Sequence, residues 1–274
     1  MSTSTPNKFI AFFGATGGCA NACLVHTLNA GLHASALART PSKLTDMLLA
    51  QGISQAVIDA QLNIVQGDIA DLSAIKDVLL SGSRRRDTPL LASEIISGIE
   101  STLQMQWSVK RPVTVDNREI CATSAKNIMQ ALQETYLEYP STAQRKPSIV
   151  VISTTGASDT NEDVPFAFRF LYDILLADAS KDKKDMERLV MGNTVDSDVA
   201  QPVFRGAVAL RPSLLVGDQN IKDGKGWQTL KVGLQDSPAV GFTVHRADVG
   251  EWIYEQIIKR GDERWFGQLV TLTS

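Results

Sequence analysis

Short apolar runs alternate along the chain with longer stretches in which apolar residues recur at helical spacing. The apolar runs predict strands near residues 8–13, 33–38, 61–66, 94–98, 147–152, 206–211 and 268–273. The amphipathic stretches predict helices near residues 18–30, 41–50, 71–79, 118–138, 164–191 and 247–259. Alternation of this kind builds a parallel sheet with helices on both faces. The sequence therefore predicts an α/β protein with a doubly wound parallel sheet.

No repeat, low-complexity tract or linker divides the 274 residues, so we expect one domain that spans residues 1–274. Two stretches, residues 80–118 and 213–243, are less regular than the rest. The second stretch follows the carboxyl end of a predicted strand, where ligands of open α/β sheets bind. We therefore expect substrate-binding segments at about residues 155–190 and 213–245.

The first predicted strand runs directly into a glycine-rich turn that opens a helix. The turn reads Gly14-Ala15-Thr16-Gly17-Gly18-Cys19-Ala20. Gly14 allows a sharp turn, Gly17 allows a pyrophosphate to approach the backbone, and small Ala20 allows the helix to pack close to its strand. The position between an N-terminal strand and a helix favours the phosphate cradle of a dinucleotide-binding, Rossmann-type fold over an ordinary glycine-rich turn.

The end of the second predicted strand indicates which dinucleotide is bound. An NAD site usually has a carboxylate there, whereas this chain has Arg39 and no acid before Asp46. The guanidinium of Arg39 suits a 2′-phosphate, and Lys43 adds positive charge. The alternative is a solvated arginine in front of a helix that begins at Thr40-Pro41. The pattern favours NADP(H).

Composition narrows the function classes. The formal net charge of −3 and the pI near 5.7 leave no basic footprint for nucleic acid. No apolar run approaches the ~20 residues that cross a bilayer, and the first residues carry no signal-peptide core, so we expect a cytoplasmic protein. Cys19, Cys23 and Cys121 are odd in number and lack metal-ligand spacing, which predicts reduced thiols and no metal.

Five motifs resemble, in order and spacing, those of the atypical short-chain dehydrogenase/reductases. They are Gly14-Ala15-Thr16-Gly17, residues 38–44, residues 67–71, residues 210–215 and Arg246-Ala247-Asp248-Val249. Within that group the chain resembles the NmrA-like and biliverdin-reductase-B-like NAD(P)-binding proteins, and most of all the averufin-oxidase-like oxidoreductases of fungal aromatic-polyketide pathways. The resemblance covers nearly the whole chain. The resemblance implies the fold and the cofactor of this protein more specifically than its reaction, because the group includes reductases, oxidases, rearrangement catalysts and redox sensors.

The resemblance also implies roles for residues at strand ends. Gly14 to Cys19 would bind the pyrophosphate, and Arg39 and Lys43 would bind the 2′-phosphate. The other implied cofactor contacts are Asp68 and Ile69 at adenine, Gly98 at ribose, Thr154 beside nicotinamide, and Pro212 and Leu214 at the carboxamide. Asp68 has the alternative of capping a turn. Arg246 and Asp248 are interpreted as an ion-paired structural corner that starts a helix.

The catalytic residues depart from the larger superfamily, in which a Tyr four residues before a Lys supplies the proton and a Ser polarises the carbonyl. The family's Lys-x-x-x-Glu spacing falls on Lys183 and Glu187, so Ala179 occupies the position of that Tyr. No Tyr-x-x-x-Lys occurs anywhere in the chain, but Ser153 is retained. Lys183 could hold ribose hydroxyls, or its segment could be a solvated helical face.

Several groups could replace the missing proton donor. Tyr172 precedes Lys183 by eleven residues and shares its helical face, at ~16 Å in an unbroken helix. Asp178 and Asp182 would serve if desolvated, and His245 titrates in the right range but more often bonds locally. No protein acid is needed if the substrate is a conjugated carbonyl, because water or Ser153 can satisfy the resulting phenolate or enolate.

The sequence thus predicts an NADP(H)-dependent oxidoreductase, monomeric or homodimeric, that acts on a flat aromatic or polycyclic small molecule and binds neither nucleic acid nor membrane. Two alternatives remain open. One is a non-redox isomerase or cyclase that keeps the cofactor as a scaffold, and the other is a regulatory protein that senses NADP(H).

The absence of an acid at the end of the second strand leads to a first test. Arg39→Ala should weaken NADP(H) about ten- to a hundredfold, because a hydrogen bond to a charged group contributes ~1.5–3 kcal/mol. Binding of NAD(H) should not change. Calorimetric titration of both cofactors into both proteins measures this, and equal affinity of the wild type for NAD(H) and NADP(H) would contradict the predicted preference.

Overall fold

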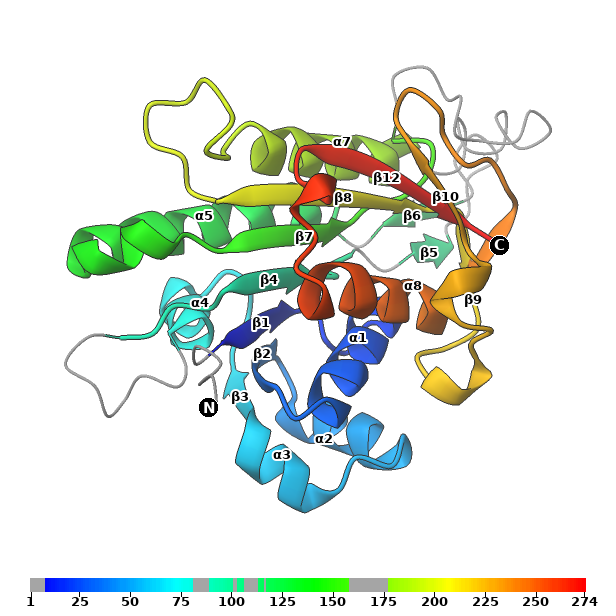
Figure 1. Cartoon of the computed structure of the whole chain (residues 1–274), viewed down its shortest axis with the longest axis horizontal. Helices are drawn as coiled ribbons and strands as arrows, with labels where there is room; N and C mark the ends of the chain where they lie inside the picture. Colours follow the sequence, from blue (N-terminus) through cyan, green and yellow to red (C-terminus); the bar gives the residue numbers. More distant parts are fainter. Residues whose placement is uncertain (1–7, 81–88, 101–102, 106–112, 116, 158–176) are drawn as a thin grey trace, which may run out of the picture.

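The computed structural model describes residues 8–80, 89–100, 103–105, 113–115, 117–157 and 177–274. Its central sheet has the strand order β10-β12-β8-β7-β4-β1-β2-β3 (Figure 1). All neighbouring strands in it are parallel except the edge strand β10, which is antiparallel to β12. The strand bounds are β1 (Phe9–Phe13), β2 (His33–Ala38), β3 (Leu62–Gln66), β4 (Glu94–Ser97), β7 (Ser148–Ile152), β8 (Gly206–Pro212), β10 (Lys231–Leu234) and β12 (Gln268–Thr273).

Helices cover both faces of the sheet (Figure 1). The first face carries α1 (Gly18–Asn29), α2 (Pro41–Ala50), α3 (Gln55–Gln61) and α8 (Arg246–Ile253), which a π-helical segment, η4 (Tyr254–Lys259), continues. The second carries α4 (Leu72–Leu79), α5 (Ile120–Glu138) and α7 (Ala177–Met191). Phe12 of β1 packs in the first core cluster and Phe13 in the second, as in a strand buried on both faces.

The predicted fold class is confirmed, and each predicted strand and helix has a counterpart. Helix α3 was not predicted, and residues 158–176 of the predicted helix 164–191 lie outside the described residues. The irregular stretches contain short strands, which are β5 (Leu103–Met105), β6 (Val113–Val115), β9 (Leu214–Val216), β10 and β11 (Thr243–His245). Short 3-10 turns complete the described chain, at η1 (Pro140–Arg145), η2 (Ile221–Asp223), η3 (Trp227–Thr229) and η5 (Glu263–Trp265).

The order of the strands fixes where a ligand can bind. The chain leaves β1 in one direction toward β2 and β3, and in the other toward β4, β7 and β8. The two connections therefore diverge at the carboxyl ends of β1 and β4, and such a divergence leaves a crevice in open α/β sheets.

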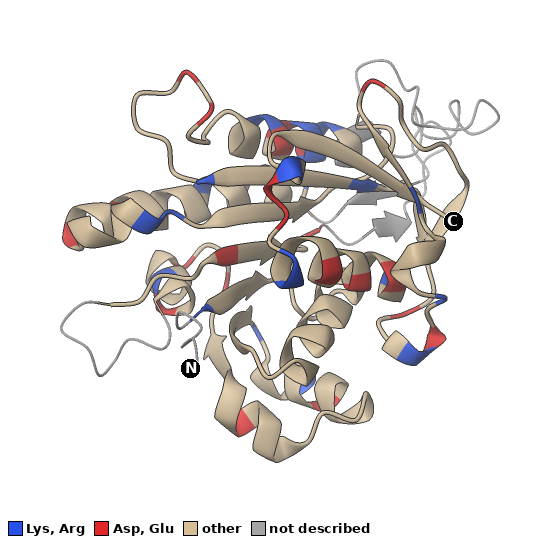
Figure 2. Ribbon diagram, viewed as in Figure 1, with Lys and Arg blue, Asp and Glu red and all other residues tan. Residues whose placement is uncertain are grey.

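Helix α7 is unusually polar for a helix that covers a sheet, and Figure 2 shows charges of both signs along it. Its inward face carries Glu187, which accepts two hydrogen bonds from Arg211 of β8, Nε to Oε1 at 2.9 Å and Nη2 to Oε2 at 2.6 Å. Both side chains are almost completely buried. A bidentate pair of this kind fixes the position of the helix along the sheet.

Removing one member of this buried pair tests its role in stability. Glu187→Gln should lower the free energy of unfolding by about 3–5 kcal/mol, because the buried charge of Arg211 then loses the carboxylate that accepts two hydrogen bonds from it. The matched control is Glu263→Gln at the exposed pair with Arg205, which should cost roughly 0–1 kcal/mol. Urea unfolding measures both, and equal midpoints for the two variants would show that the buried pair does not hold α7.

Candidate active site and cofactor groove

A groove of about 430 Å³ opens between the carboxyl ends of β1 and β4, where the strand order diverges. Its walls include seven of the residues predicted to bind the cofactor, which are Gly14, Thr16, Gly17, Arg39, Asp68, Ile69 and Gly98. The other lining residues are Leu37, Ala38, Gly67, Ile99, Glu100, Asn117 and Ile120. The groove thus joins the glycine turn, the end of β2, the end of β3 and the end of β4.

The glycine turn is shaped by close backbone contacts. Gly14 has a φ of +76°, and a Cβ there would lie 2.7 Å from the carbonyl carbon of Gly98. A Cβ on Gly98 would in turn lie 2.8 Å from the Cβ of Ala20, so α1 packs directly against the end of β4. A Cβ at Gly17 would meet only carbonyl oxygens, at 3.1 Å or more. The sharp turn at Gly14 and the close packing at Ala20 follow the sequence prediction.

The rest of the turn lies below the groove or beside it. Ala15 is fully buried, and its carbonyl oxygen accepts a hydrogen bond of 2.8 Å from Asn21. The side chain of Arg246 lies over Gly18, because a Cβ at Gly18 would be 2.2 Å from the Cδ of that arginine. Cys19 is buried at the start of α1. Ala15, Gly18 and Cys19, which were predicted to bind the pyrophosphate, are therefore not among the residues that line the groove.

The adenosine end of the groove carries Arg39, which is exposed at the end of β2. Lys43 is exposed in the first turn of α2 and does not line the groove. Oδ1 of Asp68 accepts a 3.0 Å hydrogen bond from the amide of Ala70. Asp68 therefore caps a turn, which was the alternative given for this residue. The hydrogen bond uses only one of its two carboxylate oxygens.

Lys183 and Ser153 meet at the carboxyl end of β7, outside the lining of the groove, and Nζ of Lys183 lies 3.9 Å from the groove residue Glu100. The Nζ of Lys183 donates to the carbonyl oxygens of Ile152 at 3.3 Å and of Ser153 at 3.2 Å. Lys183 is buried, so the interpretation of this segment as a solvated face is wrong for this residue. The Oγ of Ser153 is buried and has no hydrogen-bond partner within the described part of the chain. A buried hydroxyl without a partner costs free energy, which is typical of a functional position.

The neighbouring strand ends complete this region. The amide of Thr155 donates to the carbonyl oxygen of Pro212 at 3.0 Å, which joins the ends of β7 and β8. Thr154 is half-buried beside this junction. Leu214, two residues after Pro212, exposes 52% of its surface. The structure thus brings Ser153, Thr154, Lys183 and Pro212 to one edge of the sheet, whereas Leu214 turns outward.

Two of the proposed substitutes for the missing tyrosine are occupied elsewhere. Asp182 accepts hydrogen bonds from the amides of Cys121 and Ala122, both at 2.9 Å, so it caps the N-terminus of α5. The interpretation of Asp182 as a proton donor is wrong for this reason. His245 caps α8, since its Nδ1 accepts from the amide of Ala247 at 3.2 Å. Tyr172 and the side chain of Asp178 lie outside the described residues.

The tyrosines that the structure describes lie far from this edge. Tyr136 and Tyr139 lie at the C-terminal end of α5, and the hydroxyl of Tyr136 donates to the carbonyl oxygen of Val203, before the start of β8. Tyr254 follows α8 and stacks on His26 near the end of α1. Helices α1, α5 and α8 begin near the carboxyl edge, so their last turns lie at the amino edge. None of these three phenols reaches the groove.

Arg246 and Asp248 form the helix-starting corner that was predicted, but not an ion pair with each other. Arg246 donates to the carbonyl oxygen of Gly217 at 2.7 Å, and Oδ1 of Asp248 accepts from the amide of Gly226 at 2.8 Å. Both side chains thus bind backbone groups of the loop between β9 and η3. The corner anchors that loop to the start of α8.

The thiols are free, as predicted, and they are buried. Burial raises the pKa of Cys19 to about 12, Glu100 adds to this shift, and Arg246 and Lys183 oppose it. Burial also raises the pKa of Cys121 to about 12. Both thiols are therefore protonated at neutral pH and cannot act as nucleophiles there.

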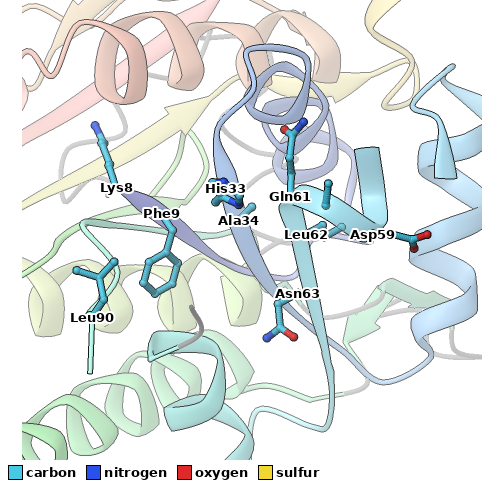
Figure 3. Close-up of a pocket in the computed structure, with 10 residues that line it drawn as sticks. Lys8, Phe9, His33, Ala34, Asp59, Gln61, Leu62, Asn63 and Leu90 are labelled. Atoms are coloured by element: carbon cyan, nitrogen blue, oxygen red, sulfur yellow. The ribbon is translucent and has the colours of Figure 1, made fainter. Parts of the chain in front are cut away.

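A second hollow, of about 350 Å³, lies at the other edge of the sheet (Figure 3). It is lined by residues from the amino ends of β1, β2 and β3, among them Lys8, His33 and Leu62. Lys8 is already bound, by an ion pair of 2.9 Å with Glu94 and a hydrogen bond to the carbonyl oxygen of Ile258. This hollow therefore belongs to the base of the fold and not to the groove.

The described residues contain no group of three or more His, Cys, Asp or Glu side chains placed to hold a metal ion. Among the helices that the structure describes, none is long and apolar enough to cross a membrane.

Known proteins resemble this chain in sequence and in structure. It is 40% identical to "Oxidase pynE" of Aspergillus niger, over 96% of this chain and 98% of that protein. It is also 40% identical to "Reductase pytE" of Aspergillus terreus over the full length of both. No family model matches the chain.

Among solved structures, a short-chain dehydrogenase/reductase of Veillonella parvula in complex with NADP matches with a TM-score of 0.63 and 15% identity, over 97% of this chain and 94% of that one. ChuY, an anaerobilin reductase of Escherichia coli O157:H7, matches with a TM-score of 0.61 and 16% identity, over 97% and 96%.

The sheet order, the glycine turn and the groove define a Rossmann fold, as the sequence predicted, and short-chain dehydrogenase/reductase structures share this fold. Within that class, the chain belongs to the family of the fungal oxidase pynE and reductase pytE. The names of these relatives identify the family as one of oxidoreductases, which confirms the predicted enzyme class.

Among the described residues that line the groove, Glu100 is the charged one that the sequence analysis did not single out. It stands two residues after Gly98, at the carboxyl end of β4, and lines the groove. The sequence could have indicated Glu100, because an acid shortly after the carboxyl end of a strand lies at the ligand-binding edge of a parallel sheet.

The open space above Gly17 leads to a test of the phosphate cradle. Gly17→Val should abolish NADPH binding, because the side chain fills the space through which a pyrophosphate approaches the backbone. The fold should be largely kept, since the new Cβ requires the carbonyl oxygen of Gly14, at 3.1 Å, to shift by only a few tenths of an ångström. Gly14→Ala is the contrasting variant, and it should lose stability because of the backbone contact at 2.7 Å. Circular dichroism and NADPH fluorescence titration separate the two effects, and normal NADPH binding by folded Gly17→Val would refute the cradle.

Proposed function

We propose that this protein is an NADP(H)-dependent oxidoreductase that transfers hydride to or from a flat, conjugated small molecule. The observation that carries the proposal is the meeting of Lys183 and Ser153 at the carboxyl end of β7, where Nζ of Lys183 lies 3.9 Å from Glu100. Glu100 and Arg39 both line the groove. The family relationship supports oxidoreductase chemistry. The resemblance to averufin-oxidase-like proteins favours an aromatic or polycyclic substrate of secondary metabolism.

The residues of the groove fit a dinucleotide. Side chains are absent at Gly14 and Gly17, where phosphates need close access to backbone amides, and the helix α1 starts directly behind them. Arg39 offers a guanidinium for a 2′-phosphate, and no carboxylate follows β2 in its place. Asp68 and Ile69 border the space for adenine. When bound, NADP(H) supplies or accepts the hydride.

Within this site, Ser153 would donate a hydrogen bond to the oxygen of a substrate carbonyl. Its hydroxyl is unpartnered among the described atoms, so it can turn toward a ligand without breaking a bond in the protein. A donor that is already desolvated and in position stabilises a developing oxyanion strongly. Lys183 lies behind it and holds the carbonyl oxygens of Ile152 and Ser153, which fixes the end of β7.

The loop region after β8 supports an apolar substrate. Leu214, Val216, Val240 and Phe242 each expose more than a third of their surface, and all four lie in the predicted substrate segment 213–245. An apolar wall suits a polycyclic ring system, and it would exclude water from the reaction. We propose that this segment and the groove form one functional unit in a cytoplasmic protein.

Hydride transfer has a direct test. With NADPH that carries deuterium at C4, the product from an accepted conjugated carbonyl should contain the label from one face of the cofactor. A panel of anthraquinone-type compounds, followed at 340 nm and by product mass, supplies the substrates. Conversion without label transfer would favour the non-redox isomerase, and NADPH binding without any product would favour the sensor.

Substitution of the serine tests its role in this reaction. Ser153→Ala should lower kcat about 10²–10³-fold, or ~2.7–4 kcal/mol, with little change in NADPH affinity, because its donor acts mainly in the transition state. The matched control is Ser148→Ala, since Ser148 lies at the amino end of the same strand and its Oγ is also buried without a partner in the described chain. An equal fall of kcat in both variants would point to packing rather than catalysis.

A further inference from the structure

Glu100 and Lys183 form a charged pair at the inner end of the groove. The Nζ of Lys183 lies 3.9 Å from Oε2 of Glu100, and the two side chains are 11% and 50% exposed. Glu100 comes from the loop after β4 and Lys183 from α7, so the pair joins two elements that are far apart in sequence. Only Glu100 lines the groove directly.

The hydrogen bonds of Lys183 show which member of the pair is available to a ligand. An ammonium group has three N–H donors, and two of these point to the carbonyl oxygens of Ile152 and Ser153. The third faces Glu100. The lysine is therefore nearly saturated by the protein, whereas the carboxylate has further lone pairs that face the groove.

The surroundings argue against a purely structural pair. The acids that anchor α7, Asp182 and Glu187, are almost fully buried and bind their partners at 2.9 Å or less. Glu100 instead is half-exposed and stands 3.9 Å from the lysine. An exposed pair with this separation contributes little to stability. Its position in the groove therefore needs another explanation.

We propose that Glu100 accepts hydrogen bonds from the vicinal hydroxyls of the ribose in the nicotinamide half of NADP(H), while the ammonium of Lys183 beside it offsets its charge. This proposal rests on the proposed function. A ribose diol has donors that suit a carboxylate, and dinucleotide sites commonly bind a ribose in this way at the adenosine end. In this chain the adenosine end has Arg39 in place of an acid. The carboxylate stands on the other side of the glycine turn instead.

The charges support a hydroxyl ligand over a phosphate for this end of the groove. A lone carboxylate would repel the pyrophosphate bound at Gly14 and Gly17, and the ammonium of Lys183 offsets that charge. The pair is formally neutral, and it therefore suits an uncharged polyol. The groove thus has a cationic end for phosphate and a neutral, hydrogen-bonding end for ribose.

The experiment compares two ligands that differ in the nicotinamide half. NADP⁺ contains both ribose groups, whereas 2′,5′-ADP contains only the adenosine end. Calorimetric titration of Glu100→Gln should show about tenfold weaker binding of NADP⁺ and unchanged binding of 2′,5′-ADP, because one hydrogen bond to a charged acceptor is weakened. Arg39→Ala should weaken both ligands. Glu119→Gln, an exposed carboxylate near the start of α5 that does not line the groove, should change neither.

Each other outcome overturns a defined statement. If Glu100→Gln binds NADP⁺ as tightly as the wild type does, the role of Glu100 is overturned and the proposed function stays intact. Equal weakening of both ligands in Glu100→Gln would show a general disturbance of the groove and would also overturn it. Failure of the wild-type protein to bind either ligand would overturn the proposed function itself. Glu100→Ala serves as a second variant, and thermal unfolding of both variants checks that the fold is kept.

Discussion

The docking of α7 is the constraint on which the reaction centre depends. This helix has few apolar side chains on its inward face, chiefly Met186 and Val190, and it is held instead by charged groups. Asp182 binds the first amides of α5, Lys183 binds the end of β7, and Glu187 binds Arg211 of β8. Each bond goes to a different element, so the helix cannot slide or rotate without leaving a buried charge unpaired, which is costly. The position of Lys183 follows from the bonds of its neighbours.

A second constraint shapes the opposite side of the groove. Gly14, Gly98 and Ala20 allow β1, β4 and α1 to approach so closely that an added Cβ on either glycine would collide with its neighbours. This contact brings the start of α1, with its free amides, to the divergence of the sheet. Helix α8 packs as closely behind it, since a Cβ at Gly250 would lie 2.6 Å from the Cβ of Ala22. The proposed phosphate end of the groove is therefore built by small residues, and the proposed reaction end by charged ones.

This difference explains what the sequence could and could not predict. Strands such as β7 and β8 are continuous apolar runs, and the glycine turn is a local motif, so both follow from the sequence alone. Helix α3 was missed because it has only seven residues, although Gly52 and the N-cap Ser54 mark its start. The reaction end depends on contacts between residues that are distant in sequence, such as Lys183 with Ser153. Spacing along α7 could not show that Asp182 caps α5, because that depends on where α5 begins.

Ala179 stands where the superfamily has its tyrosine, and no phenol among the described residues reaches the groove, so the proposed function gives the role of oxyanion donor to Ser153. An unpartnered buried hydroxyl does not by itself define such a donor, because Ser148, at the amino end of β7, has one too. The two serines differ in their surroundings. Ser153 alone lies beside Lys183 and at the edge that carries the glycine turn, and dinucleotide chemistry occurs at that edge. A conjugated carbonyl is the substrate that we propose for this arrangement, since its reduced form delocalises negative charge and does not need immediate protonation by the protein. The proposed substrate class is the same one that the exposed apolar side chains of Leu214, Val216, Val240 and Phe242 support.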